Sequence, residues 1–160
     1  MAIIYWTNGG GGDFTTTSDW STGTVPGVFD QARINARTLE FLHEVVPYIV
    51  TSSVNETVLS LTTIPNTILD VTGGIFAMSE GTNIGANDGQ IDVGDGAELA
   101  AGGTIDNKGS IYLQSTGDPT QLVTITNASL TPRCAGRCLV CCPGGRFNAG
   151  SGWGCRLGAS

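Results

Sequence analysis

The feature that most constrains this chain is an apolar repeat of nearly constant length between about Leu69 and Ile125. One apolar series has successive spacings of 22 and 20 residues, and a second has spacings of 21 and 20. The first series is Leu69, Ile91 and Ile111, and the second is Ile84, Ile105 and Ile125. A period of about 20 residues with no helical segment inside it is typical of a β-solenoid, in which each repeat forms one coil of a stacked column.

The residues inside each repeat predict short strands joined by tight turns. Apolar and polar residues alternate over short segments, and Gly, Asn and Asp occupy the gaps between them. One isolated coil would lose more conformational entropy than its few buried side chains return, so the coils must stack. We expect strands at 58–61, 68–71, 75–78, 90–93, 98–101, 110–113 and 123–126.

Three parts of the chain differ in composition. Residues 1–35 are predicted to form an N-terminal capping module, and residues 36–130 to form about three to four solenoid coils. Within the second part, 36–50 reads as a short helix or irregular loop that leads into a strand. Residues 131–160 are rich in Cys, Arg and Gly and predict an irregular tail, either non-native or disordered.

The opening module carries three large aromatic residues, Trp6, Phe14 and Trp20, in a setting rich in Gly, Thr and Ser. Two interpretations are open. The rings either pack together and close the end of the solenoid, or form an aromatic platform on which a sugar stacks.

The charge distribution argues against nucleic acid as a partner. Residues 1–130 hold all fourteen acids and three basic residues, whereas 131–160 hold four arginines and no acid. Phosphate backbones would be repelled by the acidic body. The sequence has no apolar run long enough for an integral membrane segment, and its first residues have no signal-peptide pattern.

The opening residues and the repeats together resemble a known class of proteins. The relevant segments are Trp6-x-x-Gly9-Gly10-Gly11-Gly12-Asp13-Phe14 with Trp20, Gly23-Thr24-Val25-Pro26-Gly27 with Asp30, Leu69–Gly74 and Gly102–Ile111. They resemble the β-strand-repeat, autotransporter-passenger-like and filamentous-adhesin-like modules of large secreted bacterial surface proteins.

This resemblance implies an all-β, right-handed parallel β-solenoid (β-helix) that acts as a non-enzymatic scaffold or adhesin, secreted or at the cell surface. It implies no cofactor, and a carbohydrate or a host surface as partner. Proteins of this class are usually far longer and carry an export element, so we expect a truncated relative or a fragment. A truncated last coil would favour end-to-end self-association through unpaired strand edges.

The tail raises a separate question, because its composition changes abruptly after Leu130. Enrichment in Arg, Cys, Gly, Pro and Trp is what GC-rich DNA yields when it is read out of frame. The alternatives are a loosely structured native tail and a metal or disulfide unit. A zinc site would use Cys134, Cys138, Cys141 and Cys142; disulfides or free thiols are the other outcomes.

Aspartates provide two further candidate sites in the repeats. Asp88, Asp92 and Asp95 lie within eight residues and offer the oxygen ligands that calcium prefers, although solvated acids that discourage edge aggregation explain them equally. Asp70, Asp92 and Asp106 occupy similar repeat positions and are expected in one row. Such a row would suit a carbohydrate-active β-helix enzyme, a polysaccharide lyase or hydrolase. A carbohydrate-binding module is a third alternative.

Overall fold

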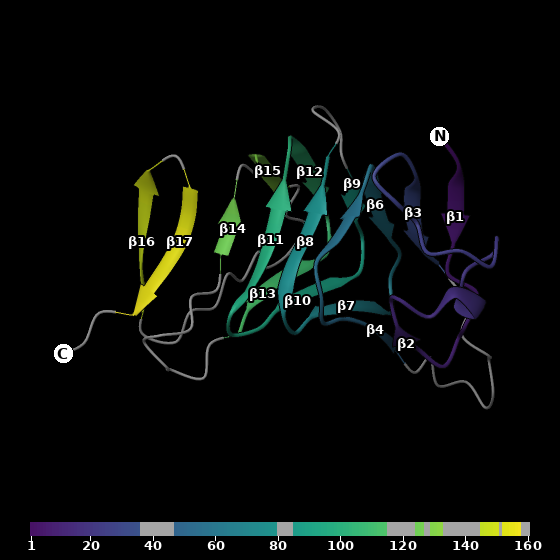
Figure 1. Cartoon of the computed structure of the whole chain (residues 1–160). Helices are drawn as coiled ribbons and strands as arrows, with labels where there is room; N and C mark the ends of the chain where they lie inside the picture. The colour runs from purple at the N-terminus through teal and green to yellow at the C-terminus, as the bar shows by residue number, and fades with distance from the viewer. Residues whose placement is uncertain are drawn as a thin grey trace.

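The computed structural model describes residues 1–35, 47–79 and 85–114 with their side chains, and the backbone of 124–126, 129–132, 145–150 and 152–157. Almost all of the described secondary structure is β-strand, and most strand pairs are parallel (Figure 1). The one described helical element is a 3-10 turn, η1 (Thr17–Asp19). The prediction of an all-β chain is therefore confirmed.

The strands form three stacked sheets. In hydrogen-bonding order, the first sheet contains β1 (Ile3–Tyr5), β3 (Gln31–Ile34), β6 (Ser60–Thr63), β9 (Gly85–Asn87), β12 (Thr104–Asn107) and β15 (Ser129–Pro132). The second contains β2 (Gly12–Asp13), β4 (Tyr48–Ser52), β7 (Thr67–Val71), β10 (Gln90–Val93) and β13 (Ser110–Leu113). The third contains β5 (Glu56–Val58), β8 (Gly74–Met78), β11 (Ala97–Ala101), β14 (Thr124–Thr126), β17 (Gly152–Leu157) and β16 (Gly145–Gly150).

Successive strands enter the three sheets in a fixed rotation. From β4 to β15, the described strands belong in turn to the second, third and first sheets. Each strand therefore pairs in parallel with the strand three elements earlier, as β7 pairs with β4 and β10 pairs with β7. Figure 1 shows the resulting columns of neighbouring strands between the two ends of the chain.

One of the two predicted apolar series is correct and the other is wrong. Ile91 aligns with Leu69 on one side and with Ile111 on the other, so these residues share a row of the second sheet. Ile105, in contrast, aligns with Gly85 in the first sheet, whereas Ile125 aligns with Leu99 in the third. Equal spacing misled here because the connections between strands differ in length, so residues 20 apart can lie in different sheets.

The first sheet was largely missed from the sequence. The strand expected at 58–61 spans a corner, because Val58 ends β5 in the third sheet and Ser60 begins β6 in the first. No strand was predicted over β9 or β12, and their last residues, Asn87 and Asn107, were interpreted as parts of turns. Apart from Ile105, which was placed in an apolar series, the two strands carry Gly, Ala, Thr, Asn and Asp, so their period-2 pattern is faint.

The core lies on the inward faces of the three sheets. Alternate residues are buried along the strands, as in β7, where Thr67, Leu69 and Val71 are buried and the residues between them are not. The largest fully buried side chains are Trp6, Phe14, Phe76, Ile34, Leu69, Ile91, Leu99, Ile105, Val50, Val58 and Val71.

The prediction of an irregular carboxyl-terminal tail is wrong for two segments. β16 and β17 form an antiparallel pair, and β17 also pairs antiparallel with β14 (yellow and light green in Figure 1). An edge strand such as β14 has unpaired N–H and C=O groups, and a following strand can satisfy them from either direction. The helix or loop expected at 36–50 falls mostly on 36–46, outside the described residues, and its continuation begins β4 at Tyr48.

Candidate functional site

The three aromatic residues of the opening segment form one buried cluster. Trp6, Phe14 and Trp20 are 1%, 0% and 2% exposed. Trp20 contacts both others edge to face, with ring centroids 5.0 Å from Trp6 and 4.8 Å from Phe14. Phe14 also contacts Phe76 of β8 at 5.2 Å. The cluster thus joins the opening segment to the core of the third sheet.

Their polar atoms are satisfied inside the protein. The indole N–H of Trp20 donates to the carbonyl of Phe14 at 2.8 Å, and that of Trp6 donates to the carbonyl of Asn8 at 2.7 Å. Rings buried to this extent present no face on which a sugar could stack. The structure places Trp6, Phe14 and Trp20 in the core rather than in a binding platform.

The same segment also covers the end of the outer edge of β1, at Tyr5. The N–H of Ser21 donates to the carbonyl of Tyr5 at 2.8 Å, and the Tyr5 N–H donates to the Ser21 hydroxyl at 3.0 Å. Next to them the N–H of Thr7 donates to the carbonyl of Asp19 at 2.7 Å. These backbone groups are therefore already hydrogen-bonded and cannot receive a further strand.

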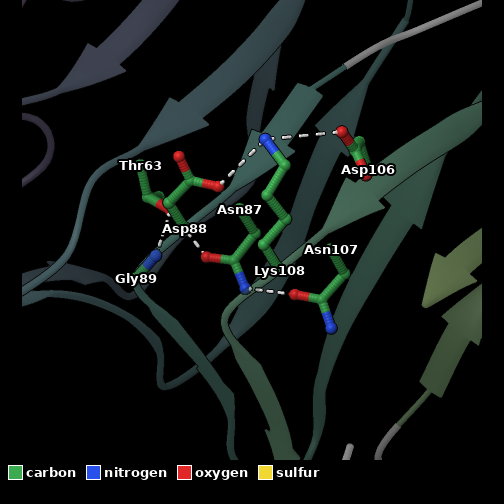
Figure 2. A network of polar contacts seen from close by, with 7 residues as sticks. All are labelled: Thr63, Asn87, Asp88, Gly89, Asp106, Asn107 and Lys108. Atoms are coloured by element: carbon green, nitrogen blue, oxygen red, sulfur yellow. Dashed lines mark hydrogen bonds and ion pairs between the residues drawn. The ribbon is translucent and has the colours of Figure 1, made fainter. Parts of the chain in front are cut away.

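A polar ladder runs along one corner of the stack, where first-sheet strands turn into second-sheet strands (Figure 2). Thr63, Asn87 and Asn107 align in register on β6, β9 and β12, and all three are buried. The Thr63 hydroxyl donates to Asn87 Oδ1 at 2.6 Å, and Asn87 Nδ2 donates to Asn107 Oδ1 at 2.7 Å. Asn87 Nδ2 also donates to the carbonyl of Ser110 at 3.0 Å.

This ladder was not recognised from the sequence, which shows Asn87-Asp88-Gly89 and Asn107-Lys108-Gly109 as turns. The signal was nevertheless present. An Asn followed two residues later by Gly recurs after 20 residues, which is the spacing of the aligned Ile91 and Ile111.

Ion pairs lie on the outer side of the same corner. Lys108 Nζ lies 3.6 Å from Asp88 Oδ1 and 3.7 Å from Asp106 Oδ2, as Figure 2 shows. All three side chains are between one third and one half exposed. Exposed pairs of this kind add little stability. Their effect is to neutralise part of the acidic charge that the turns carry.

An aspartate pair occupies the outer face of the second sheet. Asp70 of β7 and Asp92 of β10 are direct register partners. Asp92 is only 7% exposed, and Gln90 Nε2 donates to both of its carboxylate oxygens at 2.9 Å. Burial raises the pKa of Asp92, the charge of Asp70 raises it further, and the bonds from Gln90 oppose these effects. Burial also raises the pKa of Asp70.

The predicted metal and catalytic sets are not assembled as expected. Asp88 pairs with Lys108 at the corner, Asp92 lies on β10, and Asp95 lies in the turn that follows β10. Among the described residues, no group of three or more His, Cys, Asp or Glu side chains is placed to hold a metal ion. The proposed zinc ligands Cys134, Cys138, Cys141 and Cys142 lie outside the described residues.

The expected aspartate row is correct for two of its three members. Asp70 and Asp92 are neighbours in the second sheet, but Asp106 lies on β12 of the first sheet, where it aligns with Ala86. The three carboxylates therefore cannot act on one substrate bond. Asp106 follows Asp92 by only 14 residues, which is less than one repeat, and the residue beside Asp92 in the next strand is Tyr112.

Comparisons with known proteins identify no relative of this chain. No family model, no curated protein and no solved structure matches this chain. Among the described residues, no helix has the length and apolar character needed to cross a bilayer.

Proposed function

We propose that the three parallel sheets are the three sides of a right-handed β-solenoid and that this solenoid is a non-enzymatic scaffold, secreted or displayed at a cell surface. The observation that carries the proposal is the fixed rotation of β4 to β15 through the three sheets, with each strand in register above its predecessor. Right-handed crossover is the strong preference for parallel strands joined in this way.

The use of polar residues supports a structural role. The buried amides of Asn87 and Asn107 hydrogen-bond along the stack, and Lys108 neutralises acids at a corner. The aromatic residues that had offered a ligand platform are in the core. In the described part of the chain, the Asn87–Asn107 bond and the Lys108–Asp88 ion pair thus connect successive repeats.

Adhesion is the activity that we assign to this scaffold, with a carbohydrate or a host surface as partner. It follows from the resemblance of the opening and repeat segments to bacterial adhesin-like modules. We also propose that copies associate end to end, and that the hydrogen-bonded Tyr5 of β1 takes no part in this association. Sedimentation equilibrium over a wide concentration range tests this self-association, and a monomer throughout would contradict it.

The decisive experiment for the function has two arms on the same purified protein. The immobilised chain is screened against a glycan panel and extracellular matrix proteins, and is separately incubated with acidic and neutral polysaccharides. We expect saturable binding to at least one surface and no polysaccharide cleavage. Cleavage, or an absence of binding throughout the panel, would contradict the proposal.

A polysaccharide lyase or hydrolase is the second candidate, and the neighbouring carboxyls of Asp70 and Asp92 are the observation that favours it. Retaining glycosidases use two carboxyls about 5 Å apart, close to the separation of adjacent strands. The burial of Asp92 and its contact with Gln90 argue against access for a polymer. Cleavage that is abolished by Asp92→Asn and retained by Asp106→Asn would favour this candidate.

A further inference from the structure

Asp70 and Asp92 form a pair of neighbouring carboxyls, which a scaffold does not require. The two residues align directly on adjacent parallel strands, which lie about 4.8 Å apart in a sheet. Both are on the outer face, because Leu69, Val71, Ile91 and Val93 point into the core. The backbone register thus places the two side chains side by side, and it cannot separate them without a change of strand pairing.

Their described surroundings offset this charge only in part, through the two hydrogen bonds that Gln90 donates to Asp92. Asp92 is 7% exposed, and its described hydrogen-bond partner is the neutral Gln90. The other titratable side chain beside it in the row is Tyr112 of β13. Glu98, from the neighbouring strand β11, lies on the third sheet, where its register partners are Ile75 and Thr124.

The described basic side chains are engaged elsewhere. Lys108 lies between Asp88 and Asp106, and the Arg33 guanidinium lies 5.9 Å from the ring centroid of Tyr5. Within the part of the chain whose side chains are described, no cation faces the pair. Two like charges at this separation, one of them buried, are relieved most simply when one carboxyl takes up a proton.

We propose that Asp70 and Asp92 form an acid-responsive clamp, a carboxyl pair that takes up and shares one proton on acidification and then holds β7 and β10 together more firmly than at neutral pH. The proton comes from solvent and lies between the two carboxyls, so that a carboxyl–carboxylate hydrogen bond replaces a repulsion. The stack is then most stable under conditions in which most proteins begin to lose stabilising carboxylate interactions.

The direction of the effect follows from linkage. The raised pKa values mean that the folded chain binds the proton at a higher pH than the unfolded chain does. Stability therefore falls as pH rises through the folded-state pKa, and the gain on acidification is complete below the unfolded-state value. Asp13 acts oppositely, because hydrogen bonds from Thr15 lower its pKa; its contribution is lost only at more acidic pH.

The test is the pH dependence of urea unfolding for the full chain and its variants. For the wild type, we expect the folding constant to rise as the pH is lowered from neutral, because the folded chain takes up the proton more readily than the unfolded chain does. Glu56, whose pKa burial and Asp13 also raise, contributes in the same direction, so the informative quantity is the difference between wild type and variant. Asp92→Asn should be more stable than wild type at neutral pH and show a smaller rise.

Asp70→Asn should behave like Asp92→Asn, and it keeps the test decisive if one variant fails to fold. Glu98→Gln, which removes a carboxyl outside the pair, should keep the wild-type rise. Loss of stability by the same factor at every pH in both Asn variants would assign the pair a merely structural role and overturn the proposal. The proposal would also be overturned if calcium, added at neutral pH, stabilised the wild type as much as acid does but stabilised neither Asn variant.

Discussion

Replacement of Asn87 by alanine should be among the most damaging single changes in the repeats. The side chain is 1% exposed and makes three hydrogen bonds, to Thr63, Asn107 and the carbonyl of Ser110. Asn87→Ala removes all three at once and deprives each buried partner of this bond. At about 1 kcal/mol net for each bond, the expected loss is about 3 kcal/mol, and more if the partners find no water.

That loss is large beside the total stability of a small protein, which is typically about 5–15 kcal/mol. It should lower the thermal midpoint by roughly 6–12 °C in a chain of this size. The measurement is urea unfolding followed by circular dichroism. Asn55→Ala is the matched control, because Asn55 is exposed and accepts one bond, from the N–H of Ile75 at 3.0 Å. Its loss should be about 1 kcal/mol or less.

A double-mutant cycle with Thr63→Ala separates the ladder from simple truncation. If Thr63 and Asn87 act through their 2.6 Å bond, the two losses should be less than additive by about 1 kcal/mol. A loss for Asn87→Ala no greater than that for Asn55→Ala, or strict additivity in the cycle, would refute the reasoning that buried amides hold successive strands together.

Three further changes test the packing. Gly109→Ala should cost more than about 2 kcal/mol by urea unfolding, because a Cβ there would collide with the backbone of Gly89; a neutral result would contradict that register. Trp20→Phe should lower the free energy of unfolding by about 1–2 kcal/mol in the same assay, because it removes the indole hydrogen bond to the carbonyl of Phe14. A change smaller than the experimental error would show that this bond does not stabilise the fold. Ser52→Ala should be neutral or stabilising in thermal unfolding, because its hydroxyl is buried without a hydrogen-bond partner among the described residues, and a loss above about 1 kcal/mol would reveal a partner.

The middle strands of the second and third sheets were predictable because both of their inward positions are aliphatic. The segments 68–71 and 98–101 bury Leu69 with Val71 and Leu99 with Ala101, and both are strands in the structure. The row that contains Leu69 and Ile91 was predictable for the same reason. A single sequence was enough here, because burial on one face imposes the period.

The first sheet was not predictable by that rule, because other forces hold it. β9 is Gly-Ala-Asn, and its buried end is an amide that is satisfied by Thr63 and Asn107 rather than an aliphatic side chain. At Gly85, a Cβ would meet the carbonyl oxygen of Leu61 in the neighbouring strand, so a small residue is required by close backbone approach. The hydropathy pattern reveals neither the amide hydrogen bonds of Asn87 nor the close backbone approach at Gly85.

The prediction of an aspartate row was wrong for one of its three residues. Asp106 lies only 14 residues after Asp92, short of the repeat of 20 to 22 residues, and the pairing register places Tyr112 rather than Asp106 beside Asp92. The aromatic residues Trp6 and Trp20 allowed two interpretations, and composition cannot distinguish a buried cluster from an exposed platform. Burial is a property of the folded chain as a whole.

In a β-solenoid, further copies of the repeat should extend the stack without changing its other coils. Insertion of two further copies of residues 90–109 between Gly109 and Ser110 preserves the register at both junctions, because Gln90 and Ser110 are aligned. Small-angle X-ray scattering should then show the long axis increased by about 10 Å, at about 4.8 Å for each added coil, with an unchanged cross-section. An unchanged long axis, or an increase in the cross-section alone, would contradict the stacked-coil account.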